Sequence, residues 1–165
     1  MENLEKCLKK MAKYPNLFYL TRQINKNIKN YFDVRFDLKI LPADFLMFIS
    51  FLDGIKTDKF NIFSIYKENK PFDVLTFEEN STEDAVLDYL DELNIYLGSE
   101  LFFFAGDESG GRYAFKKNIH DNQIYYIPNE KPAKIISYDN FTTLLENKVD
   151  FAINNYIRKN KFLRN

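Results

Sequence analysis

The chain is poor in the residues that most often build metal sites and nucleophilic catalytic sites. It contains one cysteine, Cys7, and one histidine, His120, within 165 residues. A single cysteine excludes an internal disulfide and a cysteine-based metal cluster, and a single histidine excludes the paired histidines of common zinc motifs. The two residues are also far apart in the sequence, which disfavours a cysteine–histidine nucleophile pair. We therefore expect no enzymatic activity, no metal and no cofactor.

Long apolar runs are also missing. No stretch approaches the ~20 apolar residues that a membrane-spanning helix needs. The N-terminal segment MENLEKCLKKMAKY lacks the apolar centre of a secretion signal. These features predict a cytoplasmic protein without membrane contact, and the length fits a single domain over residues 1–165.

Basic residues are absent from one long stretch. From Pro71 to Gly111 the chain has no Lys or Arg and eleven Asp or Glu residues, whereas the first 39 residues carry nine bases and four acids. Such segregation can create an acidic face that attracts a basic partner. Alternatively, the basic ends of the chain fold against the acids and neutralise them. The bases of residues 17–31 are too sparse to indicate direct nucleic-acid binding.

The most distinctive segment runs from Leu101 to Phe115, with the sequence LFFFAGDESGGRYAF. Its first five residues form an uninterrupted apolar run, typical of a strand buried on both faces. Three of the five glycines lie between positions 106 and 111, which indicates positive φ angles or a bulge. Aromatic residues after the turn alternate with polar or small ones, as in a half-exposed strand. The pattern predicts a hairpin with Asp107 and Glu108 at its tip.

Arg112 follows the paired glycines in this acidic neighbourhood. It can pair with Asp107 or Glu108 and hold the turn, or project as an anchor for a partner, because arginine is enriched at interface hot spots. We favour the structural role. Tyr125 and Tyr126 lie on a later predicted strand, so we expect them to point to opposite faces of the sheet.

Periodicity and the positions of proline and glycine divide the rest of the chain into elements. The clearest helix opens at Leu41-Pro42, with Pro42 at its first position, and ends at Asp53-Gly54, with Gly54 as a left-handed cap. Ser81 is expected to cap another helix, and Ser137 to start the last one. The expected helices cover 3–13, 17–31, 42–53, 81–94 and 137–156, and the expected strands cover 60–66, 72–77, 101–105, 112–116, 123–127 and 133–136. This order predicts an α+β fold with a mostly antiparallel sheet flanked by helices.

Three short motifs follow one another along the chain. They are Leu41-Pro42 with Asp44-Phe45 and Asp53-Gly54, the hairpin with Gly110-Gly111, and Ile136-Ser137-Tyr138 with Phe141, Leu144 and Leu145. In this order and spacing they resemble the SMI1/KNR4 family, also called the SUKH superfamily, over residues 20–150. The resemblance implies an SMI1/KNR4-like domain, with the N-terminal helix and the basic C-terminal tail as extensions. Asp53 stands where the family usually has asparagine, and no tryptophan is present.

The resemblance implies a binding module rather than an enzyme. Many bacterial relatives are immunity proteins that neutralise a toxin, often a nuclease, and a fungal relative is implicated in cell-wall synthesis regulation through protein contacts. A nuclease needs a basic cleft to hold phosphates, which an acidic inhibitor surface would complement. The leading hypothesis is a bacterial immunity protein. The alternatives are a regulatory or scaffold module that binds a host protein or peptide in a groove, and an enzyme built on carboxylates and Arg112.

These hypotheses single out two sets of residues. The candidate partner-binding residues are Glu83, Asp84, Asp88, Asp91, Asp107, Glu108 and Arg112. The residues expected to have structural roles are Leu41, Pro42, Asp53, Gly54, Gly110 and Gly111. The expected partner is a cognate toxin or another protein.

Overall fold

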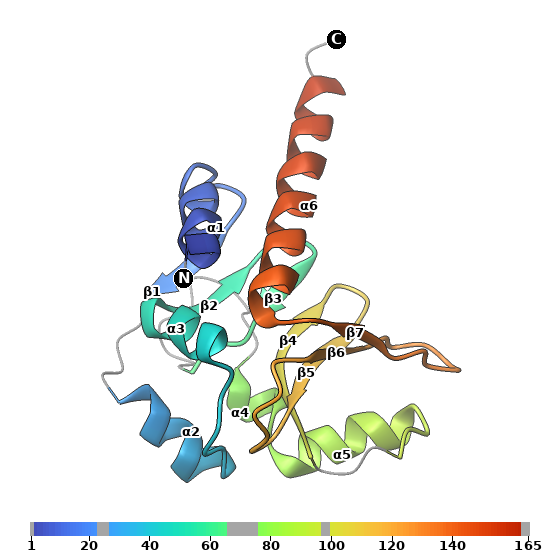
Figure 1. The fold of residues 1–165 in the computed structure, drawn as a ribbon. Helices are drawn as coiled ribbons and strands as arrows, with labels where there is room; N and C mark the ends of the chain where they lie inside the picture. Colours follow the sequence, from blue (N-terminus) through green and yellow to red (C-terminus); the bar gives the residue numbers. More distant parts are fainter. Residues whose placement is uncertain (1, 23–26, 66–75, 97–99, 163–165) are drawn as a thin grey trace.

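The computed structural model describes residues 2–22, 27–65, 76–96 and 100–162. These residues form an α+β domain with a seven-stranded antiparallel sheet in which the strands are neighbours in chain order (Figure 1). The strands are β1 (Tyr19–Arg22), β2 (Leu52–Lys56), β3 (Phe60–Ile62), β4 (Leu101–Asp107), β5 (Arg112–Lys116), β6 (Ile124–Ile127) and β7 (Ile136–Tyr138). The helices are α1 (Glu2–Ala12), α2 (Ile28–Phe36), α3 (Ala43–Phe51), α4 (Phe77–Asn80), α5 (Glu83–Glu92) and α6 (Phe141–Phe162). The expected α+β fold with a mostly antiparallel, helix-flanked sheet is confirmed.

The predicted hairpin forms the centre of the sheet. β4 and β5 pair from Leu101 opposite Lys116 to Gly106 opposite Arg112. Successive β4 side chains point to opposite faces. Phe102 and Phe104 contact aromatic rings of α2 and α3, while Phe103 contacts Tyr89 of α5. Thus α5 covers one face of the sheet, and α2 and α3 cover the other (Figure 1).

The three motifs meet in one aromatic core. Phe45, on α3, is fully buried. Its ring centroid lies 5.3 Å from that of Phe104, 5.4 Å from that of Phe115 and 5.2 Å from that of Phe141. Aromatic pairs at such distances contribute beyond the area they bury. The motif residues therefore hold α3, the hairpin and the start of α6 together.

The ends of α3 differ from the prediction. Pro42 is the N-cap residue rather than the first helical residue, and the helix ends at Phe51, followed by Leu52 with an extended backbone. Asp53 and Gly54 belong to β2, so the expected left-handed cap at Gly54 is wrong. The apolar periodicity correctly located the helix, but it carried no signal for a strand that follows without a loop.

Asp53 and Gly54 instead contact β3 and the residues that follow it, and so position β2 against them. The buried Asp53 carboxylate accepts hydrogen bonds from the Ser64 hydroxyl and the Ile65 backbone N–H, each at 2.7 Å. Gly54 has φ +126°, and a Cβ there would lie 2.9 Å from the Ile62 carbonyl oxygen. The structural role expected for both residues is supported, in a strand rather than at a helix end.

Residues 17–31 do not form the expected single helix. β1 occupies part of this range, with Tyr19 opposite Lys56 and Leu20 opposite Ile55, and α2 begins only at Ile28. Residues 23–26 lie outside the described part. The four-residue apolar spacing was compatible with a helix, but pairing along β2 outweighs that local preference. The expected helix over 3–13 is confirmed as α1.

The region before α5 also departs from prediction. Most of the expected strand over 72–77, and the turn at 69–71, lie outside the described residues, but Phe77 opens α4. Thr76 and Glu79 form a capping box at the start of that helix. Ser81 is buried and donates its hydroxyl to a β4 carbonyl, so it does not cap α5. Thr82 caps α5 instead, because its hydroxyl oxygen accepts the Ala85 backbone N–H at 3.4 Å.

The last helix starts later than predicted. Ser137 lies in β7, which covers Ile136–Tyr138 rather than 133–136, and α6 runs from Phe141 to Phe162. Its first turn is satisfied by Asn140, whose Oδ1 accepts from the Thr143 N–H at 2.8 Å. The second half of α6 extends away from the sheet (Figure 1). Among the described helices, none has both the length and the apolar character needed to cross a bilayer.

Candidate functional site

Helix α5 carries a dense set of exposed acids. They are Glu83, Asp84, Asp88, Asp91 and Glu92. Asp84, Asp88 and Asp91 are spaced four and three residues apart, so they lie along one side of the helix. The buried residues Val86 and Leu90 lie on the opposite side, against the sheet. We call these five carboxylates the acidic face of α5.

No cation of the described chain neutralises the acidic face of α5. None of its five carboxylates has a hydrogen-bond or ion-pair partner among the described residues. Other acids of the base-free stretch have ion-pair partners: Oε1 of Glu78 lies 2.8 Å from Nε of Arg35, and Glu108 pairs with Lys59. Neutralisation by other parts of the chain thus explains part of the acidic stretch but leaves α5 uncompensated.

This arrangement is unfavourable for the helix itself. Asp84 and Asp88, like Asp88 and Glu92, are like-charged pairs four residues apart, each costing roughly 0.2–0.5 kcal/mol. Asp91 and Glu92 also lie at the negative end of the helix dipole, where α5 has no base. Glu83 and Asp84 lie in the first turn, where the helix dipole favours acids. Folding stability therefore does not account for Asp88, Asp91 and Glu92, whereas a role in binding would.

Asp107 is fixed inside the hairpin turn. Its Oδ1 accepts from the Ser109 N–H at 3.0 Å, the Ser109 hydroxyl at 2.7 Å and the Gly111 N–H at 2.9 Å. Its Oδ2 accepts from the Tyr126 hydroxyl at 2.7 Å. Burial alone would raise the pKa of this carboxyl, but hydrogen bonds from Tyr126, Ser109 and Gly111 outweigh burial and hold the pKa below its ordinary value. Asp107 therefore organises the turn.

Asp107→Asn should flatten the acid limb of the stability profile. The folded pKa lies below the unfolded value of about 3.9, so the ionised carboxylate stabilises the fold at neutral pH. That contribution disappears as the pH falls below about 4 and through the folded pKa. Urea unfolding at several pH values should show a steeper loss for the wild type than for the variant. Parallel profiles would mean that Asp107 gives no pH-dependent stability.

Arg112 is held by the fold rather than by a carboxylate. Its guanidinium donates to the Gly110 carbonyl oxygen at 3.1 Å and to Asn80 Oδ1 at 3.2 Å, and lies 5.3 Å from the centroid of the Tyr89 ring. The expected ion pair with Asp107 or Glu108 is not formed. Arg112 links the hairpin to α4 and α5, which supports its structural role.

The paired glycines are explained by close packing. Gly110 has φ +87°, and a Cβ on Gly111 would lie 2.6 Å from the Tyr126 ring. The Tyr89 hydroxyl of α5 lies 3.0 Å from the Gly110 carbonyl oxygen. The hairpin tip is therefore in contact with α5 on one face of the sheet and with Tyr126 on the other.

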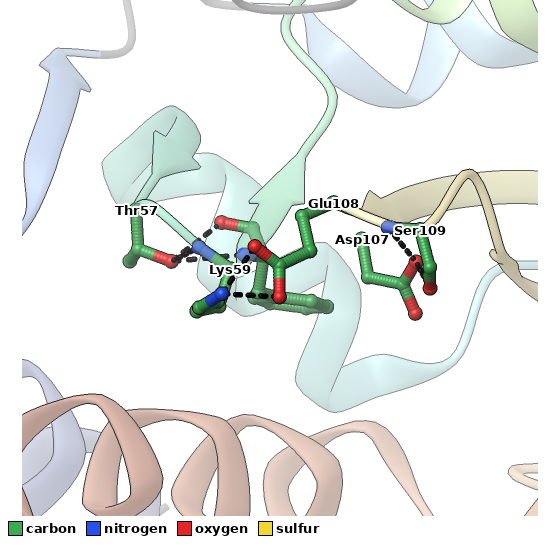
Figure 2. Close-up of polar contacts among 6 residues, drawn as sticks. Thr57, Lys59, Asp107, Glu108 and Ser109 are labelled. Atoms are coloured by element: carbon green, nitrogen blue, oxygen red, sulfur yellow. Dashed lines mark hydrogen bonds and ion pairs between the residues drawn. The ribbon is translucent and has the colours of Figure 1, made fainter. Parts of the chain in front are cut away.

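A pocket of about 290 Å³ lies between the β2–β3 turn, the β4–β5 turn and α6. Figure 2 shows its polar rim: Lys59 of the first turn pairs with Glu108 of the second. Thr57 shapes the first turn, because its hydroxyl oxygen accepts the N–H groups of Lys59 at 3.2 Å and Phe60 at 2.9 Å. Of these residues, only Glu108 was singled out from the sequence.

Lys148 of α6 lines the same pocket. Its ammonium nitrogen lies 4.8 Å from the centroid of the Tyr113 ring, 5.6 Å from that of Phe60 and 6.0 Å from that of Tyr126. We call these three rings the aromatic cage. They come from β5, from β3 and from β6, so no local sequence pattern connects them to Lys148.

The described residues offer little for metal or thiol chemistry. Among them, no group of three or more His, Cys, Asp or Glu side chains is placed to hold a metal ion. Burial raises the pKa of the Cys7 thiol to about 12, so it is protonated and unreactive at neutral pH. Comparisons with known protein-family models and with curated proteins found no match. The features of the described chain that bear on function are therefore the acidic face of α5, the pocket and the three motifs.

Proposed function

We propose that this chain is a non-catalytic protein-binding module of the SMI1/KNR4 type, an immunity protein that neutralises a cognate toxin. The acidic face of α5 is the binding surface. The observation that carries this proposal is five exposed carboxylates without a partner in the described chain. The meeting of the three motifs in one core supports the family assignment.

The charge density of α5 fits a nuclease target. The helix has 10 residues, so it is ~15 Å long at 1.5 Å per residue and carries about one negative charge per 3 Å. A nucleic-acid strand carries one phosphate per roughly 3.4 Å. The acidic face can therefore occupy a phosphate-binding cleft at a similar charge spacing. Complementary charge of this kind accelerates association and selects a basic partner.

Neutralising the acidic face of α5 should abolish protection against the toxin. The variant E83Q/D84N/D88N/D91N keeps side-chain size and removes four charges. The matched control E5Q/D33N/E130Q/D139N removes four exposed acids elsewhere. Each chain is co-expressed with the protein encoded immediately upstream, and growth is measured. The wild type and the control should protect, while the α5 variant should not, because each lost charged contact costs about 1.4 kcal/mol or more, a tenfold loss of affinity.

Two results would count against the proposal. Equal protection by both variants would remove α5 from the interface. An upstream product without toxicity would remove the immunity role. Unfolding curves of the two variants, recorded first, show whether any loss reflects folding.

A regulatory or scaffold module is the second candidate, because one groove can take a single side chain of a peptide. It has a volume of about 230 Å³ and lies between Leu17, the β2–β3 turn and α6, where Ala152 and Tyr156 adjoin Arg158. Ala152→Arg would fill it. Loss of partner binding in A152R, with binding retained by the α5 variant, would favour this second function.

A further inference from the structure

The pocket beside Lys148 combines charged groups of both signs with apolar walls. Lys59 and Lys148 supply two cations, Asp107 and Glu108 supply two carboxylates, and apolar surface comes from Phe60, Phe151 and Ala152. The Phe151 side chain is 55% exposed, so an apolar surface is open to a ligand at the pocket edge. The site lies across the sheet from α5.

Lys148 lacks an anion of its own. Among the described residues, its ammonium group has neither a hydrogen-bond acceptor nor an ion-pair partner, only the aromatic cage. Aromatic faces attract the charge but do not accept its three N–H donors as an oxygen would. Burial lowers the pKa of Lys148, while the negative charge of Asp107 opposes this effect. A half-buried ammonium of this kind gains from an incoming anion.

Asp107 does not serve as the anionic partner of Lys148. Its two oxygens already accept four hydrogen bonds from Ser109, Gly111 and Tyr126, and it forms no ion pair with Lys148. The other cation, Lys59, is occupied by the exposed carboxylate of Glu108 (Figure 2). The pocket rim thus already holds one carboxylate, supplied by the chain itself, while the deeper cation remains without one.

We propose that this pocket binds a carboxylate group carried on a short apolar stem, with the carboxylate paired to Lys148 and the stem against Phe60 and Phe151. The ligand carboxylate and Glu108 compete for Lys59. A volume of about 290 Å³ is at the small end for ligand pockets, so it accommodates one such group rather than a large cofactor. The chemistry is shared by a free aryl or alkyl carboxylate and by the C-terminal residue of a peptide. The inference does not depend on the function proposed for α5.

Nuclear magnetic resonance titration of the full-length, ¹⁵N-labelled chain tests this site. The probes are 3-phenylpropionate, its neutral analogue 3-phenylpropionamide, N-acetyl-alanyl-phenylalanine with a free carboxylate, and inorganic phosphate. The acids should shift the backbone amides of Lys59, Ser109 and Lys148 with a Kd of about 1 mM, the affinity of a weak small-ligand contact. The amide should bind at least tenfold more weakly, because it lacks the charge.

Variants of Lys148 distinguish a role in carboxylate binding from a role in packing against the aromatic cage. Lys148→Met keeps the aliphatic stem and should weaken carboxylate binding at least tenfold, whereas Lys148→Arg should restore it to within about threefold. Lys9→Met, at an exposed position of α1, is the matched control and should bind like the wild type. Glu108→Gln should bind about threefold more tightly, because Lys59 is released to the ligand.

Four results would overturn the proposal: no shifts at the pocket, equal binding of the amide, unchanged binding in folded K148M, or equal binding of inorganic phosphate. The two acids then identify the source of the carboxylate. Tighter binding of the peptide would assign the site to a chain terminus, and tighter or equal binding of 3-phenylpropionate would assign it to free carboxylates. Both outcomes support the carboxylate site.

Discussion

Phe45→Ala should lower the free energy of unfolding by about 3–5 kcal/mol, the cost of removing a buried phenylalanine ring from a packed core. Phe45 is fully buried and contacts rings from α2, α4, both strands of the hairpin and α6. Its loss would leave a cavity where the three motifs meet. Because small domains are stable by only about 5–15 kcal/mol, the variant should lose a large share of its stability.

Phe51→Ala is the matched control, because Phe51 ends the same helix with its side chain 58% exposed. It should change stability by about 0.5 kcal/mol or less. Urea unfolding followed by circular dichroism measures both variants. Equal, small effects would mean that Phe45 does not form the core contacts described above.

Gly54→Ala should destabilise the fold by at least about 2 kcal/mol, because the position combines two penalties. Its φ of +126° is strained for any residue with a Cβ, at about 1–3 kcal/mol. The new methyl group would also lie 2.9 Å from the Ile62 carbonyl oxygen, a backbone atom of the neighbouring strand β3. Relief requires β2 and β3 to separate, which would weaken the hydrogen bonds of Asp53 as well.

Gly106→Ala provides the comparison. There the nearest atom to an added Cβ is Arg112 Nη1 at 3.1 Å, the end of a flexible side chain, and φ is not in the strained range. Thermal unfolding should show a clearly smaller loss for G106A than for G54A. A G54A variant as stable as the wild type would contradict the close approach of β2 to β3.

Elements were predicted correctly from the sequence where the residue pattern fits only one kind of secondary structure. The Leu101–Phe115 hairpin and the apolar stripe of α5 were placed correctly, because an apolar run with clustered glycines and a strong period leave little ambiguity. Residues 17–31 were misassigned, because Leu20 and Ile28 satisfy a helical spacing while the edge of β2 offers strand pairing. Ser81 and Ser137 were misread as helix starts, because a hydroxyl can serve a cap, a strand or a buried carbonyl equally well.

The same difference applies to the candidate sites: a site on one helix can be predicted from the sequence, whereas a site that joins distant segments cannot. Exposure of the α5 acids follows from the period of one helix, so the sequence could predict it. The pairing of Glu108 with Lys59 depends on two turns that meet only in the fold. The cage around Lys148 joins three strands and a helix, which no local pattern reveals.

Affinity capture from a lysate of the source cells tests whether the acidic face of α5 binds a basic partner. The wild-type chain, the α5 variant E83Q/D84N/D88N/D91N and the control E5Q/D33N/E130Q/D139N serve as baits, each at low and at moderate salt. We expect the wild type and the control to retain a single basic protein that is released as salt screens the charges, and the α5 variant not to retain it. Retention of the same protein by all three baits, unaffected by salt, would contradict binding through the acidic face of α5.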